Sequence, residues 1–378
     1  MRNTRLALNL TSVALYFLSI WLIASVLARY SRDLGIGLAE VSVIWSSISL
    51  VTLVLRPFTG YLADRWSSNA AMSIGAAFSC ASSLIYLVAR DFNTLLLGRM
   101  IQGLGNSFFI APSAVAVASS SVYIGMALGM RSMLVSLGGV IGPPLAGILV
   151  DYVGYAPVFI LSTALGMVIV VINLGLKGER SDRADVSWRH AINWTVAATM
   201  LLASLGGAVL MTLLGLVQVH YRDLGYEASV FGYLSMFFAV SGLVSRYLAG
   251  RLAEEVGPLK VIAAGYLISS VSMVMFSRMY LPPWSFLAVV VYGFGLGLTV
   301  PTQQLIAISS VPPGAKNRAM SFYAMGADVG RFLGPLALGY VASIRGYVAS
   351  YQLMVLLPLA ALLVLFFMYL RTERGHLW

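Results

Sequence analysis

The feature of the sequence that most limits its fold is a series of twelve apolar stretches, each about as long as a membrane is thick. A helix needs about 20 apolar residues to cross roughly 30 Å of hydrocarbon. The stretches are apolar all round, unlike barrel strands, which alternate every second residue. Because backbone polar groups in lipid must be bonded internally, we predict twelve helices. They cover about 6–28, 40–62, 70–89, 94–118, 123–149, 156–176, 191–219, 229–250, 260–278, 284–309, 319–343 and 349–370.

The composition excludes the main classes of soluble protein. Of the 378 residues, 59% are hydrophobic and only 10% are charged, whereas a soluble domain has about 25% charged residues. One cysteine, Cys80, and three scattered histidines favour neither disulfides nor a metal site. The net charge of +10 is dispersed between apolar stretches, so no nucleic-acid partner is expected. No phosphate-binding glycine loop with lysine occurs. We predict a membrane protein that is not an enzyme and needs no cofactor or metal.

The arginines and lysines in the loops predict the orientation of the chain. Most of them fall on one side when both termini are placed in the cytoplasm, as the positive-inside rule requires for a protein of the cell membrane. Arg2 and Arg5 precede the first stretch, but this stretch is too long for a signal peptide. The longest polar segment, 177–190, is predicted to be a cytoplasmic linker between two six-helix bundles, 1–176 and 191–378.

The second half of the chain repeats motifs of the first half. At a displacement of 190 residues, Arg32-Asp33-Leu34-Gly35 returns as Arg222-Asp223-Leu224-Gly225. At the same displacement, Arg56, Gly60, Ala63 and Asp64 return as Arg246, Gly250, Ala253 and Glu254, and Gly103 and Gly105 return as Gly293 and Gly295. Gly138-x-x-x-Gly142-Pro143 is followed 192 residues later by Gly330-x-x-x-Gly334-Pro335. The repeat predicts two pseudo-symmetric bundles around a central cavity, an architecture common among secondary transporters.

Charged residues inside the apolar stretches are candidates for function, because an ionised group at mid-depth is costly unless it is paired or hydrated. Asp328 lies near the middle of its stretch, and Arg331 follows three residues later on nearly the same helix face. Such a carboxyl group can exchange a proton for the ion pair; the alternative is a static structural pair. Arg131 lies halfway along the fifth stretch, where it either binds an anionic group or extends toward the membrane surface.

Three motifs resemble the major facilitator superfamily along the whole chain. Gly60-x-Leu-Ala-Asp64-Arg65 is similar to the family's loop signature, although Ser67, Ser68 and Asn69 replace its glycine and two basic residues. Arg99-Met-Ile-Gln102-Gly103-Leu-Gly105 resembles the arginine motif linked with proton coupling. Gly129, Gly138, Gly142-Pro143 and Ala146-Gly147 resemble the pattern of drug/proton antiporters. The resemblance implies the twelve-helix fold of this family, alternating access and a proton-coupling role for Arg99 together with Asp328 and Arg331.

Other residues of these motifs are predicted to control the conformational change. A carboxylate at a helix end can face the positive N-terminus of another helix. Small residues four apart let helices approach closely, and proline permits a bend. The alternatives are a simple turn and static packing. The predicted gating residues are Arg56, Gly60, Asp64, Arg65, Arg246, Gly250, Glu254, Gly138, Gly142, Pro143, Gly334 and Pro335.

The predicted function is secondary active transport, with proton-coupled export of small amphipathic compounds preferred. The alternative is a carrier of organic anions that uses Arg131 and Arg331. A channel would need a continuous polar stripe, which no stretch contains. The first stretch also lacks the acidic residue that many similar exporters carry. We expect a monomer in the lipid bilayer whose partners are a small-molecule substrate and protons. The predicted substrate-binding residues are Arg131, Tyr16, Trp21, Gln102, Asn106, Tyr233, Phe237 and Tyr323.

Overall fold

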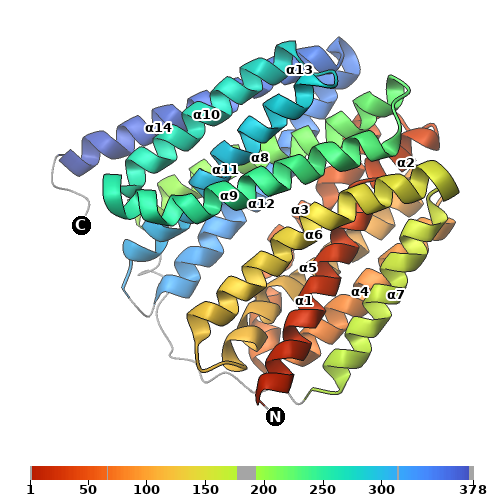
Figure 1. The fold of residues 1–378 in the computed structure, drawn as a ribbon, viewed down its shortest axis with the longest axis horizontal. Coiled ribbons are helices and arrows are strands. Elements are labelled where there is room, and N and C mark those ends of the chain that lie inside the picture. Colours follow the sequence, from red (N-terminus) through yellow and green to blue (C-terminus); the bar gives the residue numbers. More distant parts are fainter. Residues whose placement is uncertain (1, 66, 177–192, 313–314, 374–378) are drawn as a thin grey trace. The chain divides into compact units, whose positions relative to one another are not determined.

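The computed structural model describes residues 2–65, 67–176, 193–312 and 315–373, and within these ranges it contains helices and no strand. Figure 1 shows the helices in chain order. They are α1 (Arg2–Ala24), α2 (Leu27–Asp33), α3 (Leu38–Arg65), α4 (Ser68–Val88), α5 (Phe92–Ser119), α6 (Ile124–Val153), α7 (Ala156–Leu174), α8 (Trp194–Asp223), α9 (Ala228–Val256), α10 (Pro258–Arg278), α11 (Trp284–Ser309), α12 (Lys316–Arg345), α13 (Tyr347–Met354) and α14 (Leu356–Glu373).

These helices make up twelve potential membrane crossings. By length and composition, eleven segments of the described chain can span a membrane. The first, Thr4–Asp33, combines α1 and α2, and the last, Tyr347–Arg371, combines α13 and α14. The twelfth crossing is α12, which has 30 residues but is less apolar because it carries Asp328 and Arg331. The prediction of an all-α membrane protein with twelve crossings is confirmed. The predicted single helix at 6–28 is wrong in one respect, since the helix breaks after Ala24.

Four glycines in the left-handed region end helices at repeated positions. Gly35 has φ 82° and Gly225 has φ 80°, and they lie 190 residues apart. Gly154 and Gly346, with φ 96° and 82°, lie 192 residues apart. Glycine adopts this conformation without a steric cost and is the usual residue just after a helix. The displacements equal those of the sequence repeat, so both copies end the same helices in the same way.

The chain divides into two compact units. One comprises Met1–Asp182 with Gly215–Met236, and the other comprises Arg183–Leu214 with Phe237–Trp378. The first unit therefore includes the C-terminal end of α8 and the N-terminal part of α9, which the sequence analysis assigned to the second bundle. The predicted linker at 177–190 lies outside the described residues. The boundary between the bundles stays a prediction.

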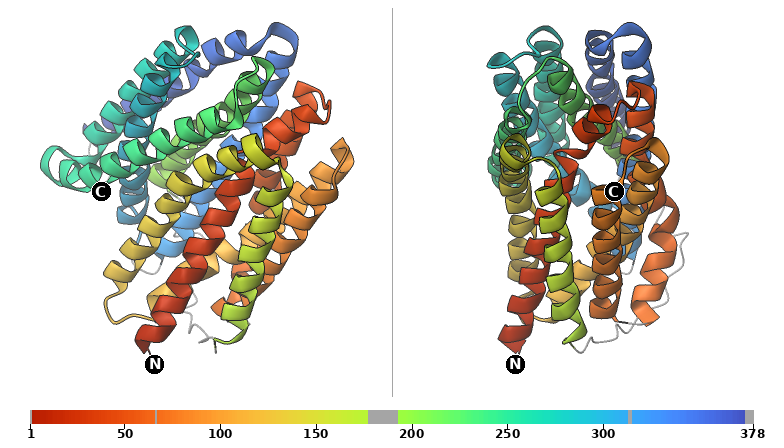
Figure 2. Two further views of the ribbon diagram at one scale, coloured as in Figure 1. Left: turned by 45° about the vertical axis from the view of Figure 1, so that its right-hand side comes forward. Right: turned by 90° about the vertical axis from the view of Figure 1, so that its right-hand side faces the viewer.

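In the first unit, helices pack closely wherever glycine removes a side chain. Helix α1 lies alongside α6 and α7, and α4 lies between α5 and α7 (Figure 2). A Cβ atom on Gly75 would come within 2.8 Å of the Gly105 carbonyl oxygen, and one on Gly103 within 3.1 Å of the Ile48 carbonyl oxygen. Only glycine permits backbones this close. These contacts fix α5 against α3 and α4.

The second unit repeats both glycine contacts. A Cβ atom on Gly265 would come within 2.8 Å of the Gly295 carbonyl oxygen, and one on Gly293 within 2.5 Å of the Phe238 carbonyl oxygen. Each of these residues lies 190 positions after its counterpart in the first unit. Helices α10 and α11 thus pack as α4 and α5 do, and the sequence repeat is also a repeat of structure.

Candidate functional site

One face of α5 carries most of the polar side chains predicted in the first unit. Gln102, Asn106, Ile110 and Ser113 follow one another at steps of four, four and three residues, so they lie on the same side of the helix. Arg99 precedes them by three residues. The spacing aligns the candidate arginine with the candidate substrate-binding residues along a single helix.

Arg99 is almost completely buried, with 2% of its surface exposed. Its Nη1 atom donates a hydrogen bond of 2.9 Å to Oε1 of Gln102, which also accepts one of 2.9 Å from the Tyr86 hydroxyl. The guanidinium carbon lies 4.5 Å from the centre of the Trp45 ring, where a cation–π interaction is favourable. The Nε and Nη2 atoms have no hydrogen-bond partner within the described part of the chain. The cation is therefore held by an amide and an aromatic face.

Tyr16 and Asn106 form a second polar contact on the same face of α5. The Tyr16 hydroxyl donates to Oδ1 of Asn106 at 3.0 Å, and the Tyr16 ring stacks on Phe109 with 3.6 Å between ring centres. Asn106 also lines a small cavity of about 20 Å³, close to the volume of a single water probe. The other residues lining this cavity are Thr52, Arg56, Ser107, Ile110 and Ala111. Two predicted substrate-binding residues thus lie beside the predicted gating residue Arg56.

Arg131 of α6 reaches the same face of α5 one turn further on. Its Nη2 atom donates to the Ile110 carbonyl oxygen at 2.8 Å and to the Ser113 hydroxyl at 2.9 Å, and its Nε atom donates to Ser113 at 3.1 Å. The side chain is half-buried. Among the described residues it makes no ion pair, so its full positive charge is held only by neutral oxygens. Tyr16, Asn106, Arg56 and Arg131 together form the candidate site of the first unit.

The candidate site of the second unit is centred on α12. Asp328 is 3% exposed and its Oδ1 atom lies 3.3 Å from Nη1 of Arg331, whose side chain is 41% exposed. Tyr323, one to two turns earlier on the same helix, is buried and lies within electrostatic reach of Arg331 and Arg246. The predicted pairing of the acid with Arg331 is present. This cluster combines one buried acid with two arginines.

The remaining predicted substrate-binding residues lie apart from these clusters. Gln102 is fully buried and bonded to Arg99 and Tyr86. Trp21 packs against the glycines of α6. Tyr233 in the first unit and Phe237 in the second are 41% and 45% exposed, and Phe237 contacts Phe286 edge to face. Their part in substrate binding stays a prediction.

The predicted gating glycines lie at helix crossings within each unit. Cβ atoms on Gly138 and Gly142 would come within 2.8 Å of Phe17 and Trp21 in α1, and one on Gly232 within 2.5 Å of the Pro143 carbonyl oxygen. In the second unit, a Cβ atom on Gly334 would lie 2.6 Å from Ala208. Gly250 has open space around it, and Pro335 lies inside α12. The side chains of Asp64 and Arg65, like Gly60, fall outside the residues whose surroundings are described, and the structure gives Arg246 and Glu254 no printed ion pair.

A cluster of three buried asparagines was missed by the sequence analysis. The Nδ2 atom of Asn69 donates to Oδ1 of Asn9 at 2.7 Å and to Oδ1 of Asn173 at 3.0 Å, and so joins α4 to α1 and α7. All three are at most 2% exposed. Asn69 occupies a position where the family motif has a basic residue, and this departure is the sequence signal that could have revealed the cluster.

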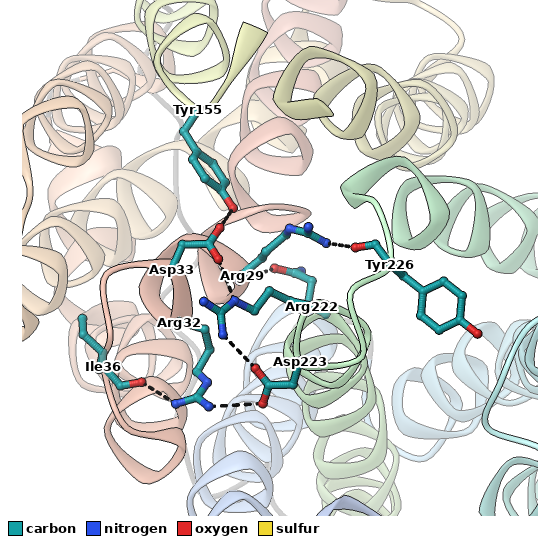
Figure 3. A network of polar contacts seen from close by, with 9 residues as sticks. Arg29, Arg32, Asp33, Ile36, Tyr155, Arg222, Asp223 and Tyr226 are labelled. Carbon is teal, nitrogen blue, oxygen red and sulfur yellow. Dashed lines mark hydrogen bonds and ion pairs between the residues drawn. The ribbon is translucent and has the colours of Figure 1, made fainter. Parts of the chain in front are cut away.

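A second missed group connects the C-terminal end of α8 with the N-terminal half of the chain in the first unit (Figure 3). Arg32 pairs with Asp223 at 3.2 Å, and Arg222 pairs with Asp33 at 2.6 Å. The Tyr155 hydroxyl donates to Asp33, and burial together with this carboxylate raises the pKa of Tyr155 well above its usual value. The neutral, donating form of the tyrosine is therefore favoured.

The break between α1 and α2 is closed by a side chain from α8 in the same unit. Gln218 Oε1 accepts from the backbone N–H groups of Ala28 and Arg29 at 3.1 and 3.4 Å, and its Nε2 atom donates to the Ala24 carbonyl oxygen at 2.7 Å. Next to it, both carboxylate oxygens of Asp151 accept from the first backbone N–H groups of α9, at Ala228 and Ser229. An acid at a helix N-terminus satisfies groups that would otherwise lack partners.

Comparison with known proteins covers almost the entire chain. The family model described as Major Facilitator Superfamily matches residues 10–325 and 196–378. An uncharacterised MFS-type transporter of Methanocaldococcus jannaschii is 22% identical over 372 residues, which covers 94% of this chain and 95% of that protein. The quinolone resistance protein NorA of Staphylococcus aureus is 26% identical, over 87% of each chain.

Solved structures with the same fold include transporters of different kinds. A POT family transporter in complex with a thioalcohol-conjugated peptide has a TM-score of 0.80 at 13% identity and covers 98% of this chain and 96% of its own. The nucleoside transporter NupG has a TM-score of 0.78 at 15% identity, over 96% of this chain and 100% of its own. These likenesses show a shared twelve-helix fold.

Proposed function

Since the chain belongs to the Major Facilitator Superfamily and is a membrane transporter of small molecules, we propose that it exports small amphipathic compounds in exchange for protons across the cell membrane. Transport takes place by alternating access, with both chain termini in the cytoplasm. The protein works as a monomer.

The observation that carries this proposal is the buried Asp328 beside Arg331 in α12. An ionised carboxylate that is 3% exposed needs a cation close by, and Arg331 at 3.3 Å is that cation. When a proton enters, the carboxyl group becomes neutral and the ion pair is lost. The Arg331 side chain, 41% exposed, is then free to bind water or substrate. Proton binding is thereby linked to a change in charge at one place in the second unit.

Two observations support export of amphipathic compounds. NorA and the multidrug resistance protein MdtG of Proteus mirabilis are among the relatives, the latter 26% identical over 87% of each chain. The candidate site of the first unit combines stacked aromatic rings, Tyr16 and Phe109, with the amide of Asn106. Such a surface binds molecules with an apolar body and a few polar groups. A quinolone is therefore the first substrate to test.

The proposal is tested by measuring flux in proteoliposomes that contain the purified protein. A quinolone is supplied on one side, and its uptake is followed with and without an imposed pH gradient. We expect saturable transport that a gradient of the correct sign accelerates and a protonophore abolishes. Liposomes without protein provide the control. Transport that is saturable but insensitive to the gradient would contradict proton coupling, and absence of any flux would contradict the choice of substrate class.

Arg131 supports a second candidate function, transport of organic anions. Its guanidinium is bonded to Ser113 and to the Ile110 carbonyl oxygen and makes no ion pair with any described residue. A substrate carboxylate can replace these neutral acceptors with a charge-assisted bond of about twice the strength. Competition between a quinolone and simple carboxylates such as benzoate distinguishes the two functions, because only an anion carrier is inhibited by carboxylates that lack an apolar body of similar size.

A further inference from the structure

The motif Arg-Asp-Leu-Gly, present in both copies of the repeat, ends its helix with the same turn each time. In the first copy, the Gly35 N–H donates to the Arg32 carbonyl oxygen at 2.9 Å and the Ile36 N–H donates to that of Ser31 at 3.2 Å. In the second copy, Gly225 donates to Arg222 at 3.0 Å and Tyr226 to Tyr221 at 2.9 Å. Both are the two-bond helix ending that requires a left-handed glycine. The arginine and aspartate therefore leave both helices with the same geometry.

The two copies bind each other reciprocally within the first unit (Figure 3). Arg32 of the first copy pairs with Asp223 of the second, and Arg222 of the second pairs with Asp33 of the first. Exchange of the copies maps one pair onto the other. Arg222 also contacts its neighbour Asp223 at 3.1 Å. We call Arg32, Asp33, Arg222 and Asp223 the ion-pair cluster.

The position of each aspartate explains why it needs an arginine from the other copy. Asp33 is the last residue of α2 and Asp223 the last residue of α8. The C-terminal end of a helix carries about half a negative charge, so a carboxylate there is unfavourable by itself. The arginine supplied by the other copy offsets both negative charges. The sequence thus places an unfavourable charge on each helix end that only the reciprocal contact relieves.

The cluster is also exposed enough to separate at low cost. Between 23% and 35% of each side chain is accessible, so water can solvate the four groups when the pairs break. Ion pairs of this exposure are weak. By contrast, Gln218, which joins the same helices, is only 2% exposed and neutral. A contact that must form and break in every transport cycle requires the first kind of interaction.

We propose that the ion-pair cluster is a reversible latch that holds the predicted outer ends of α2 and α8 together when the transporter is closed on that side. This inference rests on the proposed function, because alternating access requires the contact to open once per cycle. The latch opens when all four charged groups exchange their partners for water. It is built from the repeated motif itself, so each copy supplies one cation and one anion.

The latch is tested by a double-mutant cycle with neutral variants, Arg32→Gln and Asp223→Asn, alone and together. The reporter is Ser229→Cys in a Cys80→Ser background, so that it is the single thiol. Ser229 is 9% exposed, and a Cβ atom on Gly147 would lie 2.5 Å from its Cα atom. It is therefore covered while α9 stays against α6. A membrane-impermeant maleimide, added from the predicted outer side, labels it only after separation.

We expect each single variant to speed labelling by about 1.5- to 5-fold, the range for a partly exposed ion pair. The double variant should label no faster than the faster single variant, because the second change removes a partner that is already lost. Arg345→Gln, at the end of α12 on the same predicted side, is the matched control and should leave the rate unchanged. The pair Arg222→Gln and Asp33→Asn should give the same pattern.

Unchanged labelling in the single variants, or effects that multiply in the double variant, would overturn the latch. Melting temperatures of all variants, measured in detergent, confirm that faster labelling does not reflect unfolding. Labelling needs neither substrate nor a proton gradient. The latch can therefore fail while proteoliposomes still show proton-driven flux, and that flux can be absent while the cycle shows coupling.

Discussion

Gly330 in α12 lies so close to Ser204 in α8 that the space between the two backbones has no room for a side chain. A Cβ atom on Gly330 would be 1.8 Å from the Ser204 carbonyl oxygen. Gly326 and Gly334, one turn away on either side, contact Met200 and Ala208 in the same manner. This seam supports the stretch of α12 that carries Asp328.

Gly330→Ala should therefore destabilise the protein. The added methyl group must push α12 away from α8, and overpacking of this kind typically costs about 1–3 kcal/mol. Gly250→Ala is the matched control, because that helical glycine has nothing within 4 Å, and alanine there should stabilise the helix by about 0.5–1 kcal/mol. Thermal unfolding in detergent measures both. Equal melting temperatures for the two variants would contradict the tight seam.

Asp328→Asn should abolish transport driven by a proton gradient while leaving substrate exchange at equilibrium partly intact. Asparagine has nearly the same shape but cannot bind and release a proton, so the link between protonation and the Arg331 pair is lost. Both reactions are measured in the same proteoliposomes, with Asp328→Glu as a control that keeps the titratable group. Normal gradient-driven flux in Asp328→Asn would remove this residue from the coupling mechanism.

Arg131→Gln should weaken the binding of anionic substrates by about 10- to 100-fold, the loss that corresponds to a hydrogen bond with a charged group. Neutral substrates should bind almost as before, because glutamine can still donate to Ser113 or Ile110. Competition binding with a matched pair of compounds, a carboxylate and its amide, measures the difference. A similar loss for both compounds would indicate that Arg131 only braces α6 against α5.

Asn69→Ala should lower the free energy of unfolding by about 1–3 kcal/mol, because it leaves the buried Oδ1 atoms of Asn9 and Asn173 without their donor. Ser132→Ala, which removes an exposed hydroxyl bonded only within its own helix, is the control and should have little effect. Thermal unfolding measures both variants. If the two were equally stable, the three asparagines would not be an interhelical anchor.

Tyr155→Phe should destabilise the protein equally at pH 6 and pH 9. Burial and the Asp33 carboxylate raise the pKa of Tyr155 in the folded protein, so its stabilising effect is complete below the ordinary tyrosine pKa of about 10 and is lost only as the pH rises through the folded value. The lost bond to a charged group is worth about 1.5–3 kcal/mol. Melting temperatures of parent and variant across this pH range provide the measurement. A difference that shrinks toward pH 9 would contradict the raised pKa.

The membrane crossings could be predicted almost completely from the sequence, because their length and apolarity are local properties. The break between α1 and α2 could not. The sequence from Trp21 to Leu27 is continuously apolar apart from Ser25, and the groups that the break exposes are satisfied by Gln218, nearly 190 residues away. A local pattern contains no information about such a distant partner.

The candidate site was predicted in part for a similar reason. The pairing of Asp328 with Arg331 follows from their spacing on one helix, and so does the alignment of Asn106 with Gln102. Which groups Gln102 contacts depends instead on the rotation of α5 against α3 and α4, which places it against Arg99 and Tyr86. The Arg-Asp-Leu-Gly motif was found as a repeat, but the reciprocal pairing of its copies depends on folding.

Gln218 occupies, in the second copy of the repeat, the position that Ala28 occupies in the first, and its side chain binds the backbone of that very residue. One descendant of the duplicated ancestor has thus become a component of the other. Two half-length polypeptides expressed separately would each lack something, since the first would carry an unfinished helix and the second an amide without a purpose. The duplication is complete in sequence, yet neither half is any longer a self-sufficient protein.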